Sequence, residues 1–398
     1  MHRKAFRYRV YPTPEKIVRL QAWEDALRFL WNLALEQRQL GLERWPRRFY
    51  TAFDQINELT ELRAELPWLS DVPRNVCAQL LVELDKAWQR CFRKLARAPR
   101  FKRKGRDRLG LCEPHPKTWR LAESQLRFPK LGPLRTVLHR PLEGTSKTCT
   151  IRRDGDQWFA SISCEINDEA EPLSRLTPIV ALDRGVANLV ADSDGHLIQN
   201  RAFGERTRRR LARAQRTVCR RKKGSKNREK AKARVARLHR KIQRQRDHVA
   251  HTLSASYAKS HGTVVVEKLQ ILNMVRANHS LARRILDSSW GRLVELLRYK
   301  LAWSGGQLVE VPAHYSSQTC HRCAAVDAES RRSQAAFSCT SCGLQMHADL
   351  NAALVLKHRA NRSVLPVEGS VLEAPRRSRK RLHVPRRSPE SPALQGAG

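Results

Sequence analysis

Four cysteines near the end of the chain place the strongest geometric constraint on how it can fold. They form two Cys-x2-Cys pairs separated by fifteen residues, and the four are Cys320, Cys323, Cys339 and Cys342. Each pair can present two thiolates to one tetrahedral metal ion, and this spacing is typical of a zinc ribbon. Four thiolates leave no open coordination position, so we predict a structural Zn²⁺. The alternative is a chance grouping of reduced cysteines.

The charge of the chain indicates a polyanionic partner. Lys and Arg number 77 against 38 Asp and Glu in 398 residues, which gives a formal net charge of +39. Repulsion among so many like charges weakens a compact fold, so we expect a nucleic acid as the partner and neither a membrane nor a small-molecule substrate. No apolar run approaches the roughly 18 residues of a membrane span, and the N-terminus lacks a signal-peptide core. We therefore expect a cytoplasmic protein.

Hydrophobic periodicity separates the first half of the chain into two kinds of segment. Residues 4–11 alternate like a half-buried strand, whereas residues from 15 to about 97 have helical spacing. The stretch 99–170 is rich in turns and contains short strand-like pieces. We predict a β-rich, barrel-like domain made of residues 1–14 and 99–175, with a helical domain, residues 15–98, inserted in it. The basic run 99–108 is either a phosphate-contacting loop or a solvated one.

The second half of the chain has the pattern of an α/β domain. Buried-strand runs end at Asp183 and Glu267, and a helix is predicted near 288–303. Residues 205–246 contain 20 Lys or Arg and only two Glu, with an interruption at Gly224-Ser225. We predict two antiparallel helices that line a nucleic acid, the alternative being solvated basic helices. The tail 359–398 is predicted to be disordered.

Three acidic residues stand where they can converge. Asp183 and Glu267 each end a predicted strand, and Asp349 begins a predicted helix. Carboxylates at adjacent strand ends and a helix start can bind hard divalent cations through oxygen. Taken singly, each has another explanation: Asp183 can open a turn, Glu267 can be an exposed strand end, and Asp349 can be a helix N-cap.

Six motifs in order resemble those of the TnpB family, the transposon-encoded relatives of type V CRISPR effectors. They read ALDRGVANLVADSDG, RKKGS, VVVEKLQ, SSWGRLVELLRYKLAW, SSQTCHRC and FSCTSCGLQMHADLNAAL. The resemblance implies a RuvC-like nuclease domain of RNase H fold over residues 176–358, with a basic helical hairpin 205–257 and a zinc ribbon 316–346. It also implies a catalytic triad of Asp183, Glu267 and Asp349 that holds Mg²⁺ or Mn²⁺.

The resemblance further implies partners and their contacts. Members of the family are guided by RNA and act on double-stranded DNA beside a short recognition motif. The stretch VPRNVCAQLL is similar to the family's recognition helix and suggests DNA contacts, while the basic hairpin suggests contacts to guide RNA; the candidates are Arg74, Asn75, Gln79, Arg220, Arg221, Lys222 and Lys223. Ala181, His347 and Ala348 depart from residues that are common in the family's motifs, but no triad carboxylate is missing.

The predicted fold class is thus multidomain α+β, and the predicted function is RNA-guided hydrolysis of DNA by a transposon-associated endonuclease. We expect it in a prokaryotic cytoplasm, at the nucleoid when bound to target. Three alternatives remain: a miniature type V CRISPR effector, an RNA-guided DNA-binding repressor without cleavage, and a zinc-ribbon RNA-binding protein without catalysis. The repressor predicts loss of triad acids, and none is lost.

Overall fold

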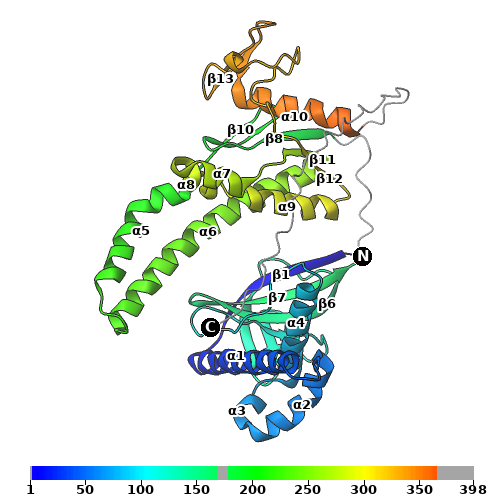
Figure 1. Cartoon of the computed structure of the whole chain (residues 1–398), viewed down its shortest axis with the longest axis vertical. Helices are drawn as coiled ribbons and strands as arrows, with labels where there is room; N and C mark the ends of the chain where they lie inside the picture. The colour runs from blue at the N-terminus through cyan, green and yellow to red at the C-terminus, as the bar shows by residue number, and fades with distance from the viewer. Residues whose placement is uncertain (1, 168–177, 365–398) are drawn as a thin grey trace, which may run out of the picture.

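The computed structural model describes residues 2–167 and 178–364, which form two lobes that each contain a β-sheet (Figure 1). We call residues 2–167 the N-terminal lobe and residues 178–364 the C-terminal lobe. One hydrophobic cluster fills the N-terminal lobe and runs in sequence from Phe6 to Ile166. The clusters on the two faces of the second sheet contain only residues of the C-terminal lobe. Each lobe therefore has its own core.

A seven-stranded antiparallel sheet organises the N-terminal lobe, in the order β2-β6-β7-β1-β5-β4-β3. The strand predicted for residues 4–11 is confirmed, because Phe6, Tyr8 and Val10 are buried at alternate positions of β1. The strands are β1 His2–Tyr11, β2 Leu111–Glu113, β3 Arg120–Ala122, β4 Gln125–Phe128, β5 Gly132–Val137, β6 Thr145–Asp154 and β7 Gln157–Ile166. β1 lies between β7 and β5, so the N-terminal strand joins the two halves of the sheet.

Four helices share the core of this lobe. Trp23, Leu27 and Leu84 belong to the same hydrophobic cluster as the buried strand residues. The helices are α1 Pro14–Glu43, α2 Ala52–Glu65, α3 Pro67–Ser70 and α4 Arg74–Phe92. α4 packs on β2 of the sheet, while α2 packs on α4 and α3 packs on α1 and α2. The helical spacing of residues 15–97 thus predicted helices correctly, although it did not indicate that these helices and the strands form a single packing unit.

The second sheet has five strands in the order β10-β9-β8-β11-β12, and both of its faces are covered. β8, β11 and β12 are parallel, whereas β9 and β10 run antiparallel to their neighbours. Val180 and Leu182 pack toward α9, while Ala181 and Val265 pack toward α10. Burial on both faces explains the almost uninterrupted apolar runs of these strands. The bounds are β8 Ile179–Asp183, β9 Asn188–Asp192, β10 Leu197–Gln199, β11 Thr263–Glu267, β12 Gln307–Val311, α9 Trp290–Trp303 and α10 Ala348–Val364.

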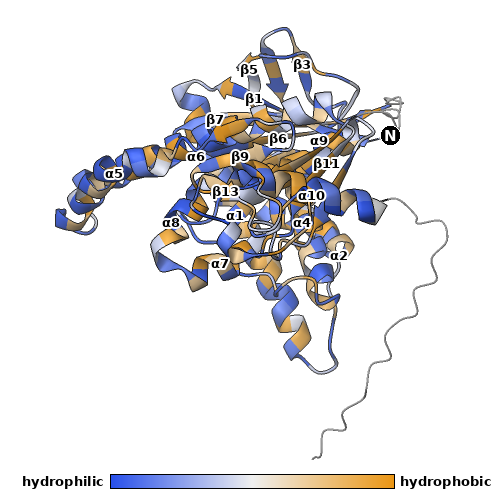
Figure 2. Cartoon of the chain, turned by 90° about the horizontal axis from the view of Figure 1, so that it is seen from above, coloured by the Kyte–Doolittle hydropathy of each residue, from blue (hydrophilic) through white to orange (hydrophobic). Residues whose placement is uncertain are grey.

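The basic segment forms a hairpin of two helices, α5 Phe203–Arg220 and α6 Lys226–Ser260, as the interruption at Gly224-Ser225 predicts. Ser225 caps α6 by accepting a hydrogen bond from the Arg228 backbone N–H. Ala214, Ala231 and Ile242 are buried in the narrow seam, and the remaining surface is largely hydrophilic where the hairpin projects from the body (Figure 2). A hairpin this basic, with so little buried surface, presents most of its charge to a partner or to solvent.

The remaining elements complete the C-terminal lobe. α7 Ile271–Ala277 and α8 His279–Ser288 precede α9, and the cysteine region contains the short helix η1 Ala328–Ser330 and the strands β13 Ala336–Ser338 and β14 Gln345–His347. α10 continues to Val364, so residues 359–364 are helical and not part of a tail as predicted; Ala360 is buried in the core and no Gly or Pro ends the helix earlier. Residues 168–177, at the predicted end of the β-rich domain, and residues 365–398 of the predicted tail lie outside the described residues. Among the described helices, none combines the length and apolarity of a membrane span.

Candidate active site

Asp183 and Glu267 end two strands that are parallel neighbours. The register pairs Leu182 of β8 with Val266 of β11, directly before the two acids. The carboxyl ends of parallel strands lie at one edge of a sheet, so both side chains leave that edge together. Glu267 is buried and Asp183 is partly buried.

Asp349 approaches the same edge from α10, which packs on β8. The helix begins at Ala348, so Asp349 lies inside the first turn and not at the capping position before it. Its Oδ2 accepts a hydrogen bond from Asn188 at 2.9 Å, and its Oδ1 lies 3.4 Å from a guanidinium nitrogen of Arg331. The position before the helix belongs to His347, whose Nδ1 accepts from the Asp349 backbone N–H at 3.2 Å. The N-cap explanation of Asp349 is therefore wrong.

The three carboxyl groups interact electrostatically. Burial raises the pKa of Asp183 well above its usual value, and the negative charges of Glu267 and Asp349 raise it further, while Arg331 opposes the shift. Repulsion of this kind is relieved when a cation binds between carboxylates, and hard divalent cations prefer oxygen ligands. The three carboxyl groups therefore offer the kind of ligand atom that a hard divalent cation prefers.

The sequence analysis did not predict three residues that contact the side chains of Glu267 and Asp349. The buried hydroxyl of Ser316 donates to Glu267 Oε1 at 2.9 Å, and Asn188 and Arg331 contact Asp349 as described above. Ser316 stands in the SSQTC motif and Arg331 stands between the two cysteine pairs, but neither has a local pattern that indicates a carboxylate partner. Arg184, directly after Asp183, is also buried and donates to the backbone carbonyl of Glu267.

The four predicted cysteines lie together beside α10. Their Sγ atoms all fall within 4.8 Å of one another, and the Cys320–Cys342 and Cys323–Cys339 sulfur pairs are each 3.6 Å apart. Zn–S bonds of about 2.3 Å in a tetrahedron would place the sulfurs about 3.8 Å apart. The Cys342 backbone N–H donates to Cys339 Sγ, and this bond is the largest of several that together lower the pKa of the Cys339 thiol to about 6. The ligand set and its spacing therefore fit one structural zinc ion.

Both cysteine pairs are followed by a residue in the left-handed backbone region. Gly343 has a φ of +69° after the second pair, and Ala324 has a φ of +61° at the equivalent position after the first. A residue with a Cβ is strained there, whereas glycine is not. The first turn thus keeps the ribbon conformation at an energetic cost that the second turn avoids.

The candidate nucleic-acid contacts lie in other parts of the molecule (Figure 1). Arg74 is exposed at the start of α4, whereas Asn75 donates to the buried Glu113 at 3.0 Å and Gln79 bonds the carboxyl group of Glu83. At the tip of the α5–α6 hairpin, the four predicted basic residues are all exposed: Arg220, Arg221, Lys222 and Lys223. The two amide side chains of α4 are therefore engaged within the N-terminal lobe, while the hairpin tip is open to a partner.

A basic groove runs between α6 and the N-terminal lobe. Its larger part, a cavity of about 1000 Å³, is lined by α1, the 104–108 loop, the 153–156 turn and α6. Arg108, Arg153 and Arg240 line this cavity and also a neighbouring one. Part of the basic run 99–108 thus faces the basic hairpin across the groove.

Three protein-family models match parts of the chain. Residues 161–278 match the OrfB_IS605 family, described as "Probable transposase", and residues 290–356 match the TNB domain of Cas12f1-like proteins. Residues 1–44 match a model described as a helix-turn-helix domain. That description differs from the structure, in which this segment forms β1 and the single helix α1.

Curated relatives match most of the chain. "Putative RNA-guided DNA endonuclease InsQ" of Escherichia coli K12 is 32% identical over 369 residues, which cover 88% of this chain and 90% of the relative. A "Putative RNA-guided DNA endonuclease" of Streptomyces pristinaespiralis is 36% identical over 359 residues, 88% of each chain. The chain belongs to the TnpB family, the OrfB proteins of IS605-type transposons.

A solved structure has the same overall fold. The protein in a Cas12f1–sgRNA–target DNA complex superposes with a TM-score of 0.55 at 15% identity, covering 86% of this chain and 82% of that one. The predicted α+β class with a four-cysteine ribbon is thereby confirmed in its coarse form.

Proposed function

We propose that this protein is an RNA-guided DNA endonuclease that hydrolyses phosphodiester bonds with divalent metal ions held by Asp183, Glu267 and Asp349. The observation that carries the proposal is the convergence of these acids: two end parallel neighbouring strands, and the third interacts with them from the first turn of α10. The names of its relatives support the same activity.

The C-terminal lobe then corresponds to the RuvC-like nuclease domain of RNase H fold that the sequence predicts over residues 176–358. Its mixed sheet, with a parallel centre and an antiparallel edge, supports this assignment. The ribbon 316–346 would hold the structural zinc, and the hairpin 205–257 would extend toward the guide RNA. In the same proposal, the N-terminal lobe comprises a β-rich part (1–14 and 99–175) and a helical part (15–98) that faces the target DNA.

Side chains around the acids would prepare them for catalysis. When bound, divalent ions activate water for attack on phosphorus and stabilise charge on the leaving oxygen. Ser316 holds Glu267 in one orientation, and Asn188 does the same for Asp349, as partners of metal-binding carboxylates usually do. Arg331 brings a positive charge beside Asp349, where it can contact a phosphate oxygen of the DNA.

The proposed partners are guide RNA and double-stranded DNA. A net charge of +39 calls for a polyanion, and the hairpin concentrates that charge on a projecting surface. In RNA-guided recognition, base pairing between guide and target reads the sequence, while the protein holds the backbone. A densely charged surface suits that task, because it binds the phosphate backbone independently of the base sequence.

The test separates cleavage from binding. Asp349→Ala in the RNA-loaded protein should bind matched duplex DNA normally and lose cleavage by at least about 10²–10³-fold with Mg²⁺. Glu15→Ala, which removes a first-turn acid from α1, is the matched control and should cut at the parental rate. If Asp349→Ala cuts at close to the parental rate, the metal-site proposal is wrong and the RNA-binding alternatives become preferable.

A further inference from the structure

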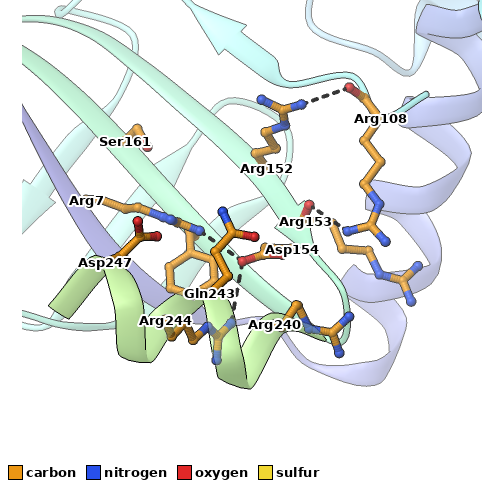
Figure 3. Close-up of a pocket in the computed structure, with 11 residues that line it drawn as sticks. Arg7, Arg108, Arg152, Arg153, Asp154, Ser161, Arg240, Gln243, Arg244 and Asp247 are labelled. Carbon is orange, nitrogen blue, oxygen red and sulfur yellow. Dashed lines mark hydrogen bonds and ion pairs between the residues drawn. The ribbon is translucent and has the colours of Figure 1, made fainter. Parts of the chain in front are cut away.

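Arg184 is a buried arginine that forms no ion pair among the described residues. Its side chain is 6% exposed, and its hydrogen bond goes to the backbone carbonyl of Glu267. The two other buried arginines of the described chain, Arg28 and Arg38, both pair with acids. Figure 3 shows the same pairing at a pocket, where an arginine of β1 and one of α6 share the carboxylate of Asp154. Arg184 is therefore an exception that ion pairing does not explain.

A buried guanidinium without a paired carboxylate destabilises the fold. Burial lowers the pKa of the Arg184 guanidinium, and the charges of acids beyond ion-pair distance, Glu267 first among them, offset only part of this cost. The Nε donor of Arg184 is also buried and has no acceptor among the described residues. An apolar side chain of similar volume packs at such a position with less cost. Stability of the fold therefore does not explain the arginine, which indicates a role at the neighbouring site.

Arg184 and the acids belong to opposite faces of the sheet. Along β8, Ala181 packs toward α10 and Leu182 packs toward α9. Side chains alternate between the faces of a strand, so Asp183 falls on the α10 face, which also carries Asp349. Continued alternation places Arg184 on the α9 face. Its guanidinium therefore supports the carboxylate edge from behind and does not act as a metal ligand.

The parallel ladder between β8 and β11 stops just before the two strand-end acids. Pairing ends one residue before Asp183 and Glu267, whereas β11 and β12 remain paired through Glu267. The next backbone N–H, that of Lys268, donates to Val311 of β12 at 2.8 Å. Successive peptide groups point to opposite neighbours, so the Glu267 carbonyl points toward β8, where Arg184 donates to it. The arginine thus supplies a bond between β8 and β11 beyond their last backbone pair.

The loop that follows β8, residues 184–188, is held close to the rest of the lobe. Trp290 of α9 donates to the Gly185 carbonyl at 3.2 Å. A Cβ added to Gly185 would lie 2.7 Å from the carbonyl oxygen of Asn188, so the loop closes on itself too tightly for a larger residue. A loop fixed in this way gives the arginine side chain a fixed base.

We propose that Arg184 is a positioning residue that sets the spacing between the carboxylates of Asp183 and Glu267, and thereby where they hold divalent ions. The inference rests on the proposed function for the presence of those ions. The loop that begins with Arg184 ends at Asn188, which bonds Asp349 at 2.9 Å, so one short segment connects all three acids. Metal ions that share carboxylate ligands lie close together, and a small change in the spacing of the ligands disturbs each of them.

The first experiment replaces Arg184 by Met, an unbranched apolar side chain that suits the α9 face. The melting temperature of the metal-free full chain should equal or exceed that of the parental protein, because a buried charge is removed. DNA cleavage by the RNA-loaded protein should nevertheless fall by about 10- to 100-fold at saturating Mg²⁺, the usual effect of removing a partner of metal ligands. DNA binding in EDTA should be unchanged. Arg184→Lys keeps a charged donor and should recover part of the rate.

Metal binding separates positioning from folding. Mg²⁺ demands near-ideal octahedral geometry, whereas Mn²⁺ also prefers oxygen ligands but is larger and tolerates distorted coordination. The loss of cleavage in Arg184→Met should therefore be larger with Mg²⁺ than with Mn²⁺. Mn²⁺ bound to the RNA-free full chain is measured by electron paramagnetic resonance, and its affinity should fall by about tenfold.

Arg63→Met is the matched control. Arg63 is a half-buried arginine of α2 whose guanidinium donates to the backbone carbonyls of Leu69, Ser70 and Val72 and contacts none of the three acids. Its loss should lower the melting temperature and leave both the Mn²⁺ affinity and the ratio of Mg²⁺ to Mn²⁺ cleavage rates at the parental values.

Three results would overturn the inference: parental cleavage and Mn²⁺ affinity in Arg184→Met, a lowered melting temperature as its only change, or a loss of cleavage matched by an equal loss of DNA binding. Asp349→Ala, measured alongside, tests the proposed function itself. If Asp349→Ala loses cleavage and Mn²⁺ affinity while Arg184→Met keeps both, the inference alone is wrong. If Asp349→Ala keeps both, the proposed function is wrong.

Discussion

Ser316 offers a sharp test of how the carboxylate cluster is held. Its Oγ donates to Glu267 Oε1 at 2.9 Å, and both side chains are buried, with exposed fractions of 5% and 7%. Ser316→Ala removes that donor and leaves the carboxylate in place. Glu267 then keeps its charge but loses the bond that fixes its orientation.

Two estimates of the effect agree. A hydrogen bond to a charged group contributes about 1.5–3 kcal/mol, and a tenfold change in an equilibrium constant corresponds to about 1.4 kcal/mol, so the loss is roughly 10- to 100-fold. Removing the partner of a metal-binding group typically weakens metal affinity or activity by about the same factor. The concentration of Mg²⁺ required for half-maximal cleavage should therefore rise by about 10- to 100-fold.

The assay is a Mg²⁺ titration of DNA cleavage by the RNA-loaded protein, with DNA binding measured in EDTA. Ser316→Thr keeps the hydroxyl and should restore most of the Mg²⁺ dependence. Ser254→Ala removes a fully buried hydroxyl of α6 that bonds His251 and Lys300 and none of the three acids, and it should leave the titration unchanged. A Ser316→Ala protein with a lowered melting temperature but the parental Mg²⁺ dependence would refute the argument.

Three further predictions follow from the site and the charge. Asp183→Asn should raise the free energy of unfolding of the metal-free protein at neutral pH, because folding raises the pKa of this carboxyl group. The gain in stability should shrink as the pH falls through the folded-state pKa, and thermal unfolding in EDTA at several pH values measures it. Ala324→Gly should slow zinc release to a chelator and Gly343→Ala should speed it, because each changes the backbone strain of its turn by about 1 kcal/mol. Release at the parental rate from both variants would contradict the backbone argument. Replacing residues 220–223 at the hairpin tip by Gln should reduce the slope of log RNA affinity against log salt concentration by about one unit per lost phosphate contact. An unchanged slope would mean that the tip does not contact the RNA.

Local sequence patterns determined several elements of this protein. The apolar runs that end at Asp183 and Glu267 predicted β8 and β11, because strands covered on both faces need apolar residues at almost every position. The cysteine spacing predicted a four-sulfur cluster, because two residues between ligands allow one turn to present both thiolates. The density of Lys and Arg likewise predicted the basic hairpin. Each of these signals lies within a short stretch of chain.

Contacts between distant segments were decided only by the tertiary structure. Asn188 and Arg331 meet at Asp349 from a strand and from the ribbon, and nothing in their neighbouring residues indicates that meeting. The same holds for Arg7 of β1 and Arg244 of α6, which approach one aromatic ring, that of Phe159. Periodicity reports which face of an element is buried, but it carries no information about which other element covers that face. The strand register and the packing of α10 and α6 supply that information, because they alone fix which side chains share a site.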